Sequence, residues 1–384
     1  MRVVNADVAV VGGGIVGLAT AYELARRGVK VALVERGFVG GGSSTRNAAR
    51  FRVQFSNVEN TRYAKEAVKY LLSISRRLRW NPIVRIGGYL WLFRDERGLK
   101  AFEEANNSIW RRLGVGVRFL SMGEVEDRYP YINAKLYVGA AYAPQDGELH
   151  HDFLIYGYYE ALKDLGAFIL DNVGEARVVA SNGRVVGVES SSASVKANVV
   201  VVAAGAWTPQ ILRGLGVELP ISVVRKEIGV TIPVRHFIEP SLIVDVKVNA
   251  YVGQTLRGEL IGSVEIPEEA GMKPMVNTYR WLKAWARAMA EAIPSTSSIP
   301  IMRVWSGYYD VTPDNSHVMG RVESWPKGLY VASGFGGHGL MFGPYTGRLM
   351  AEYILEGREP DVMRPFNPGR FAEGRLIREA LVIG

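Results

Sequence analysis

Residues 6–17 read ADVAVVGGGIVG, an apolar run that leads directly into a glycine-rich turn. The apolar residues that follow recur at helical spacing, and the RRG at residues 26–28 is typical of a helix end. A second apolar run, residues 30–34, leads into the acid Glu35. This order of strand, G-x-G-x-x-G turn, helix, strand and acid predicts a site for a dinucleotide.

Each glycine of that turn has a distinct task. Gly12 permits the tight turn, Gly14 lets a pyrophosphate approach the backbone, and Gly17 lets the helix pack closely on the strand. The helix N-terminus is expected to face the phosphates, and Glu35 to accept hydrogen bonds from a ribose.

Three further segments favour FAD over NAD. A Gly/Ser loop at 40–44 continues into the polar, basic segment 45–54, which offers donors to a second face of an extended pyrophosphate. Residues 197–207 (ANVVVVAAGAW) predict a buried strand that ends in a small-residue turn. Residues 333–355 predict a glycine-rich loop that leads into a helix, whose N-terminal dipole suits the negative charge of a reduced flavin.

The composition excludes several classes of protein. Among 384 residues there is no cysteine, so a disulfide, an iron–sulfur cluster, a catalytic thiol and a cysteinyl link to a cofactor are all excluded. The net charge of +8 comes from scattered basic residues, which argues against a nucleic-acid interface. The lack of cysteine and the abundance of arginine are typical of heat-adapted proteins.

The apolar runs bear on where the protein is expected to reside. None approaches the ~18–20 residues of a membrane helix, and the strand that begins near Asp7 leaves no room for a cleavable leader. We therefore expect a cytoplasmic protein, with attachment to the inner face of the membrane as an open alternative.

Several segments, taken in chain order, resemble the D-amino-acid-oxidase superfamily of FAD enzymes, which includes glycine oxidase, sarcosine oxidase and dye-linked L-proline dehydrogenase. They are GGGIVG (12–17), GSS (42–44), VVVAAGAW (200–207), RVWSGYYDVTPDNSHVMG (303–320) and GFGGHGLMFGP (334–344). Within the superfamily, the chain most resembles the catalytic β-type subunits of archaeal dye-linked L-proline dehydrogenases. The segments behind this are SSTRNAARFRVQF (43–55), NAYVGQT (249–255), RVWSGYYDVTPD (303–314) and NPGRFAEGRL (367–376).

The resemblance implies an α/β fold in which a Rossmann-like FAD-binding domain is interleaved with an α+β substrate domain built on an antiparallel sheet. The FAD-binding domain is expected to take 1–82, 143–220 and 302–384, and the substrate domain 83–142 and 221–301. Residues 223–233 and 251–266 are expected to form part of the substrate-domain sheet. Asn182-Gly183 predicts a hairpin turn within the FAD-binding domain.

The resemblance also implies non-covalent FAD and oxidation of an amine, with hydride transfer to flavin N5. The predicted FAD-binding residues are Val11, Gly12, Gly14, Ile15, Val16, Gly17, Glu35, Arg36, Ser43, Ser44, Arg46, Asn47, Ala49, Ala204, Gly205, Trp207, Gly307, Gly336, Gly337, His338, Gly339, Leu340 and Met341. The expected reaction is oxidation of L-proline to 1-pyrroline-5-carboxylate.

An amino-acid substrate needs an anchor for its carboxylate, and a guanidinium fork suits it best. By resemblance to sarcosine oxidase the anchor is Arg52, rather than Arg46 or Arg303. Tyr251 is expected to assist through its hydroxyl, and His338 to contact the substrate or to set the geometry of its loop. No general base is evident in the sequence.

Two departures from the family bear on the substrate and on the electron acceptor. Tyr309 replaces the carboxylate-binding Arg of glycine and D-amino-acid oxidases, and Met341 replaces a Lys of sarcosine oxidase. No lysine lies between Lys247 and Lys273, where oxidases of the superfamily often place one over the flavin. These features favour a dehydrogenase that passes electrons to a quinone, a dye or a partner subunit.

Other functions stay open at this point. They are a sarcosine, glycine or D-amino-acid oxidase, a tRNA-modifying flavoprotein and an electron-relay subunit, as well as a homo- or hetero-oligomeric assembly. No metal is expected, because His150-His151-Asp152 precedes an apolar helix for which Asp152 is interpreted as the N-cap. The three remaining histidines, His236, His317 and His338, are scattered along the chain.

Overall fold

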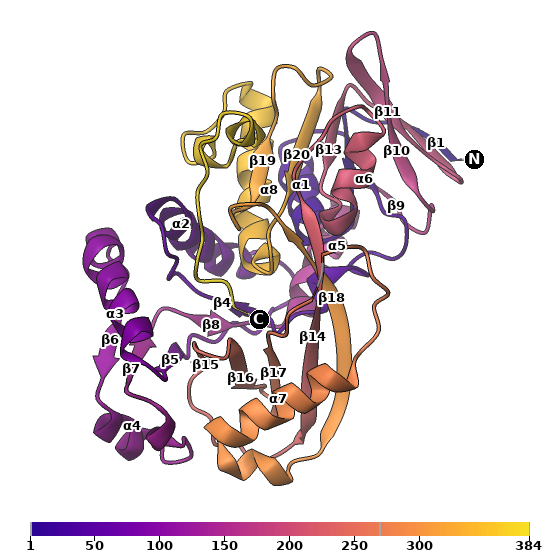
Figure 1. Cartoon of the computed structure of the whole chain (residues 1–384). Coiled ribbons are helices and arrows are strands. Elements are labelled where there is room, and N and C mark those ends of the chain that lie inside the picture. Colours follow the sequence, from indigo (N-terminus) through magenta and orange to yellow (C-terminus); the bar gives the residue numbers. More distant parts are fainter. Residues whose placement is uncertain (1, 269, 384) are drawn as a thin grey trace.

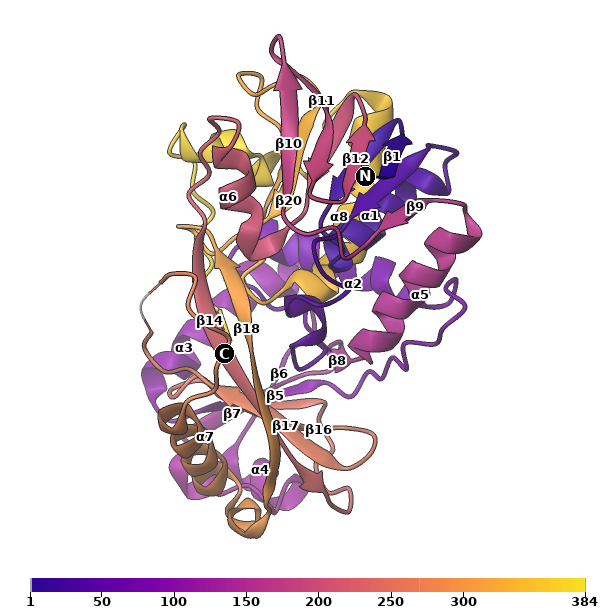
Figure 2. The same ribbon diagram turned by 90° about the vertical axis from the view of Figure 1, so that its right-hand side faces the viewer.

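The computed structural model describes residues 2–268 and 270–383 of the chain (Figures 1 and 2). It contains the helices α1 (Ile15–Ala25), α2 (Val58–Ser75), α3 (Glu96–Ala105), α4 (Met122–Arg128), α5 (His151–Asp164), α6 (Thr208–Arg213), α7 (Tyr279–Ala292) and α8 (Gly339–Glu356). The strands form a six-stranded, an eight-stranded, a four-stranded and a two-stranded sheet. The expected α/β fold class is confirmed.

The six-stranded sheet contains the glycine-rich turn. Its order is β19 (Val318–Gly320), β20 (Leu329–Ser333), β13 (Val199–Val202), β2 (Val8–Val11), β3 (Val31–Val34) and β9 (Phe168–Leu170). All its pairs are parallel except β19 with β20. The parallel strands end together, so the loops after β2, β3 and β13 meet at one edge, where ligands of such sheets bind.

Alternate residues of β2 pack on opposite faces of this sheet, as the pleat requires. Val8 and Val10 belong to the core formed with α1, α2, α5 and α8. Ala9 and Val11 belong to the core formed with α6 and the four-stranded sheet. That sheet has the order β1 (Arg2–Asn5), β12 (Ala193–Lys196), β11 (Arg184–Ser190) and β10 (Ala176–Ser181). The expected turn joins β10 and β11, with positive φ at Asn182 and Gly183.

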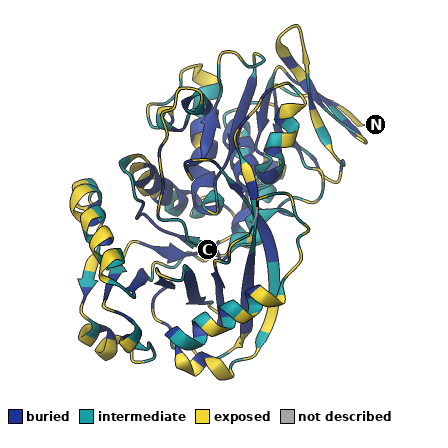
Figure 3. Ribbon diagram, viewed as in Figure 1, coloured by how far each residue is buried: buried dark blue, intermediate teal, exposed yellow. Residues whose placement is uncertain are grey.

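The eight-stranded sheet forms the other half of the molecule. Its order is β18 (Ile301–Val311), β14 (Ser222–Pro233), β17 (Glu259–Val264), β16 (Ala250–Gln254), β15 (Leu242–Asp245), β5 (Tyr89–Phe93), β7 (Gly139–Ala143) and β6 (Arg118–Leu120). One face packs on α4 and α7 through buried residues such as Trp281 and Trp285. The outer side of α7 is exposed (Figure 3). The expectation that 223–233 and 251–266 contribute strands is confirmed.

Two long strands, β14 and β18, pair over most of their length and run from the eight-stranded sheet up to the six-stranded one (Figure 2). A small ladder of β4 (Arg50–Phe51) and β8 (Gly147–Glu148) also lies between the two halves. The division into two interleaved domains stays a prediction. The membership of the strands supports it, although β18 extends across the proposed boundary at 302.

Within the glycine-rich turn, the backbone of Gly17 packs directly against the backbone of Gly12. Gly12 has a φ of +113°, and a Cβ on Gly17 would lie 1.9 Å from the carbonyl oxygen of Gly12. Since that neighbour is backbone, an alanine at 17 must push α1 away from β2.

We therefore expect Gly17→Ala to lower both the melting temperature and the FAD content of the purified protein, the latter by at least about tenfold, because displacing α1 disturbs the phosphate-binding turn. Thermal unfolding and the ratio of flavin to protein absorbance measure the two effects. The matched control is Gly123→Ala in α4, where an added Cβ meets no atom within 4 Å and helix propensity favours alanine. Normal FAD loading by Gly17→Ala would contradict the assigned role of the turn.

Candidate active site

A cavity of about 500 Å³ lies where the parallel strands end and β14 and β18 cross above them. It brings together nearly all of the predicted site residues, which come from segments up to 330 residues apart in the sequence. Those in its lining are Val11, Gly12, Gly14, Ile15, Val16, Glu35, Arg36, Ser43, Ser44, Arg46, Asn47, Ala49, Arg52, Ala204, Gly205, Trp207, Tyr251, Gly307, Gly337, His338, Gly339, Leu340 and Met341. Gly17 and Gly336 lie outside the lining and shape it through the backbone.

Glu35 marks one end of the cavity. Its two carboxylate oxygens accept hydrogen bonds from the backbone N–H groups of Gly13 (2.7 Å) and Gly37 (2.8 Å). These bonds fix the carboxylate and leave lone pairs for the hydroxyls of a ribose. The Arg36 guanidinium lies 4.3 Å from the ring centre of Trp207, so a flat cationic and aromatic surface adjoins the same end.

The Gly/Ser loop forms hydrogen bonds with both halves of the molecule. The Ser44 hydroxyl accepts from Ile15 N–H (3.0 Å) at the start of α1, while the Ser43 hydroxyl donates to the carbonyl of Tyr308 (2.7 Å) on β18. Asn47 donates to the carbonyls of Ser43 and Ser44 and accepts from Ala49 N–H. The loop is therefore held rigidly beside the glycine-rich turn.

At the other end, the loop before α8 is organised by Asp310, which is buried and lies on β18. Its carboxylate accepts from the Ser333 hydroxyl (2.9 Å) and from Gly334 N–H (2.6 Å). Helix α8 begins at Gly339 without a side-chain cap, so its first N–H groups and its positive dipole end face the cavity. This is the arrangement expected beneath an electron-rich flavin ring.

Arg52 is the most unusual group in the cavity wall. Arg52 is only 3% exposed, and in the described part of the chain no carboxylate forms an ion pair with it, although the charges of Glu379 and Asp146 act on it from nearby. Its guanidinium donates to the carbonyls of Gln54 and Leu381 and lies 4.1 Å from the ring centre of Phe55. A buried positive charge without a carboxylate in direct contact is costly, which suits it to receive an anion.

His338 lies directly on Arg52. Its Nε2 atom is 3.1 Å from Arg52 Nη2 and accepts the hydrogen bond, because a guanidinium has no acceptor. Burial, and then the charge of Arg52, hold the pKa of His338 well below its usual range, so the ring is neutral. His338 thus positions Arg52, and its Nε2 is occupied and unavailable as a base.

Three tyrosines form an aromatic wall around this end of the cavity: Tyr89, Tyr251 and Tyr309. Burial raises the pKa of Tyr309 to about 12, and it also raises the pKa values of Tyr89 and Tyr251. All three hydroxyls are therefore protonated at neutral pH and can donate to a substrate. Met341 lies in the first turn of α8 and offers no charge there.

The sequence analysis missed two cations of the cavity wall. Arg50 is held by Glu148 (2.8 Å) and by two backbone carbonyls. Lys226 on β14 lies beside Tyr309 and pairs with Glu265 at 3.0 Å. A lysine of the oxidase type would lie between 247 and 273, but Lys226 lies outside that range and reaches the cavity because β14 pairs with β18, which places Lys226 opposite Gly307. Lys226 shares one face of its strand with the apolar Ile228, and this charge on an apolar face was the available signal.

Two other residues considered in the sequence analysis, Arg303 and Asp152, lie outside the cavity lining. Arg303 is exposed on β18 and is not part of the cavity lining. The interpretation of Asp152 as an N-cap is wrong, because α5 already begins at His151 with His150 as its N-cap, and Asp152 lies in the first turn. There its charge is favoured by the helix dipole.

The potential ligand atoms of His150, His151 and Asp152 lie within 4.8 Å of one another. His151 contacts Asp152 at 2.8 Å, and the His150 ring stacks on Phe153. The stacking of His150 and the contact between His151 and Asp152 account for the cluster without a metal. The expectation of no metal site stays a prediction.

The fold and the cavity define a flavoprotein oxidoreductase, with a dinucleotide turn below and a cationic, aromatic pocket above. The chain belongs to the family of FAD-dependent oxidoreductases, whose model matches residues 7–353. It is 29% identical to the sarcosine oxidase β subunit of Rhodobacter capsulatus, over 98% of this chain and 91% of that one. It is 27% identical to glycine oxidase of Geobacillus kaustophilus, over 94% and 96%.

Among solved structures, L-proline dehydrogenase from P. horikoshii superposes with a TM-score of 0.90 at 28% identity, covering 98% of this chain and 100% of the other. The protein is thus an FAD-dependent oxidoreductase of amino acids or related amines. The cavity fits FAD, since two helix N-termini and a fixed acid open onto it and Gly205 leaves open space in its lining. Within the described residues, no helix has the length and apolar character needed to cross a membrane.

Proposed function

We propose that this protein is an amino-acid dehydrogenase that oxidises L-proline to 1-pyrroline-5-carboxylate. In this reaction the ring nitrogen loses a proton and the adjacent C5 carbon loses a hydride, so that a C=N bond forms. Bound FAD supplies the hydride acceptor, its N5 atom. The protein supplies position: Arg52 holds the carboxylate, and the tyrosine wall encloses the apolar ring.

The observation that carries this proposal is the buried Arg52 guanidinium, which forms no ion pair with a carboxylate of the described residues and shares its part of the cavity wall with three tyrosines. A small ring with one carboxylate complements such a pocket. The likeness to L-proline dehydrogenase of P. horikoshii over the full length supports the same substrate.

We further propose that the electrons pass to a quinone, a dye or a partner subunit. The likeness to sarcosine oxidase β subunits supports a partner subunit. It also favours a second candidate, sarcosine oxidation, which requires the same carboxylate anchor and a smaller pocket. In the described cavity wall, the charge of Lys226 is the feature that favours reaction with oxygen, although Glu265 already pairs with this lysine.

Added to the FAD-loaded protein without oxygen, L-proline is expected to bleach the oxidised-flavin absorbance within seconds, and D-proline, sarcosine and glycine to do so at least about tenfold more slowly. Stopped-flow absorbance measures this. A reoxidation step with air or with a soluble quinone then identifies the acceptor. Faster bleaching by sarcosine would transfer the proposal to the second candidate, and no bleaching by any amino acid would refute both.

A further inference from the structure

The C-terminal chain, yellow in Figure 1, descends to the middle of the molecule and ends between the two halves (Figures 1 and 2). We name the segment 377–383 the closing segment. Its first part is buried at Ile377 and Glu379, and its last part, 381–383, is half-buried. It therefore reaches the substrate end of the cavity from a firmly held base.

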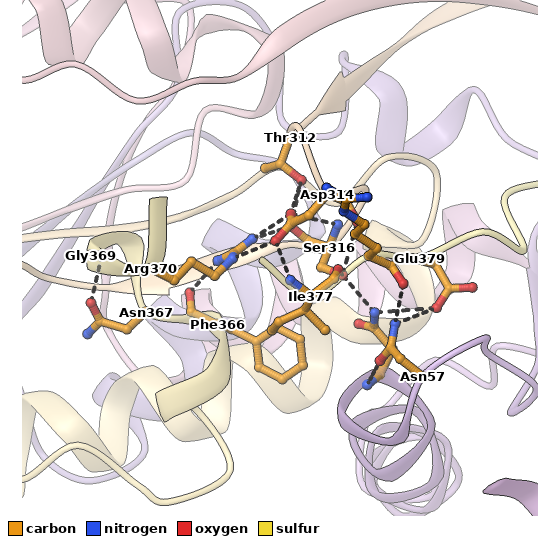
Figure 4. A network of polar contacts seen from close by, with 12 residues as sticks. Asn57, Thr312, Asp314, Ser316, Phe366, Asn367, Gly369, Arg370, Ile377 and Glu379 are labelled. Atoms are coloured by element: carbon orange, nitrogen blue, oxygen red, sulfur yellow. Dashed lines mark hydrogen bonds and ion pairs between the residues drawn. The ribbon is translucent and has the colours of Figure 1, made fainter. Parts of the chain in front are cut away.

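A network of polar contacts holds that base (Figure 4). Ile377 N–H donates to the Asp314 carboxylate (2.9 Å), which is itself paired with the fully buried Arg370. The Glu379 carboxylate accepts from Ser56 N–H (2.9 Å) and from the Asn57 side chain (2.9 Å).

Beyond Ala380 the segment touches the substrate pocket itself. The Leu381 carbonyl accepts a hydrogen bond from Arg52, and Ile383 forms part of the cavity wall. The Val382 carbonyl accepts from Asn249 (3.3 Å), next to the strand that carries Tyr251. The end of the segment thus covers the group that would anchor a substrate.

We propose that residues 381–383 are a lid that satisfies Arg52 in the free enzyme and is displaced when a carboxylate binds. This rests on the proposed function, because Arg52 is taken as the anchor. The Leu381 carbonyl and a carboxylate compete for the same Nη2–H group, and a carboxylate is the stronger acceptor for a guanidinium. This Nη2–H group is therefore never left buried without an acceptor, and the lid admits only ligands that bring a negative charge to it.

The test uses cyclopentanecarboxylate, which has a ring and a carboxylate but no amine to oxidise. A chain ending at Ala380 keeps the contacts of Asp314 and the bonds of Glu379 with Ser56 and Asn57, and it loses, together with the lid, the bond from Leu381 N–H to Glu379 (2.8 Å). Its Kd for this probe, from the perturbed flavin spectrum of the FAD-loaded protein, is expected to be about tenfold lower than that of the full chain. The control is Arg378→Ala, an exposed residue of the same segment outside the cavity lining, which keeps the Leu381 carbonyl and is expected to change the Kd less than threefold.

Hydrogen exchange gives the second readout: in the full chain the probe is expected to speed exchange of the amides of 381–383. Equal or weaker binding by the shortened chain, or unchanged exchange on ligation, overturns the lid. If the probe displaces the lid while L-proline fails to bleach the flavin, only the proposed substrate is refuted. If L-proline bleaches the flavin and shortening the chain leaves the Kd for the probe unchanged, only the proposal of a lid is refuted.

Discussion

Replacing Arg52 by methionine is expected to lower kcat/KM for L-proline by roughly 10²–10³, mostly through a higher KM. Truncating one partner of a buried, hydrogen-bonded charge pair costs about 2–5 kcal/mol, and each 1.4 kcal/mol is tenfold. Methionine keeps an apolar stem of similar volume, so Phe55 and Trp91 around it stay covered. Arg52→Lys is expected to recover only part of the loss, because an ammonium lacks the planar fork.

Steady-state kinetics with an artificial dye as acceptor measure the effect, and the flavin-to-protein ratio confirms equal loading. The matched control is Arg303→Met, an exposed arginine on β18 outside the cavity lining, which is expected to leave kcat/KM within twofold. An unchanged KM in Arg52→Met would place the carboxylate anchor elsewhere, with Arg50 and Lys226 as the cations next to be replaced.

Arg370→Met is expected to lower the free energy of unfolding by about 3–5 kcal/mol. Both side chains of the Arg370–Asp314 pair are fully buried, and the guanidinium donates to both oxygens of the carboxylate. Burial raises the pKa of Asp314, but Arg370, Ile377 N–H and the Thr312 hydroxyl together outweigh that effect and hold the pKa below its usual value. Without Arg370 the carboxylate stays buried without its counter-charge, and the base of the closing segment loosens.

Chemical denaturation followed by tryptophan fluorescence measures this loss. The control is Arg364→Met, which breaks the exposed pair with Asp361 and is expected to cost at most about 0.5 kcal/mol. An equal effect of the two substitutions would show that the Asp314 network contributes no more than a surface ion pair.

The cofactor half of the site could be predicted because its signals are local. The turn at 12–17 requires glycine at positions 12 and 17, since a Cβ at either would collide with adjacent backbone. The loop at 40–44 and the start of α8 likewise carry their information in a few consecutive residues. The glycine pattern, the acid after β3 and the period of the strands therefore sufficed to place these residues around one dinucleotide.

The substrate half could be predicted only in part. Arg52 was found through a family motif, but its burial without an ion-paired carboxylate among the described residues, its bond to His338 and its cover by Leu381 arise from segments up to 329 residues away. Tyr89 and Ile383 lie in the wall because of the order of the strands and because the chain returns there near residue 383, and neither arrangement has a local signal in the sequence. Lys226 has a local signal, its place beside Ile228 on one strand face, but that signal does not show which cavity Lys226 lines. Residue types and short-range periodicity determined the fold class and the FAD site. The burial of charge at Arg52 was decided by tertiary packing, because the cost of removing a charge from water depends on everything that surrounds it.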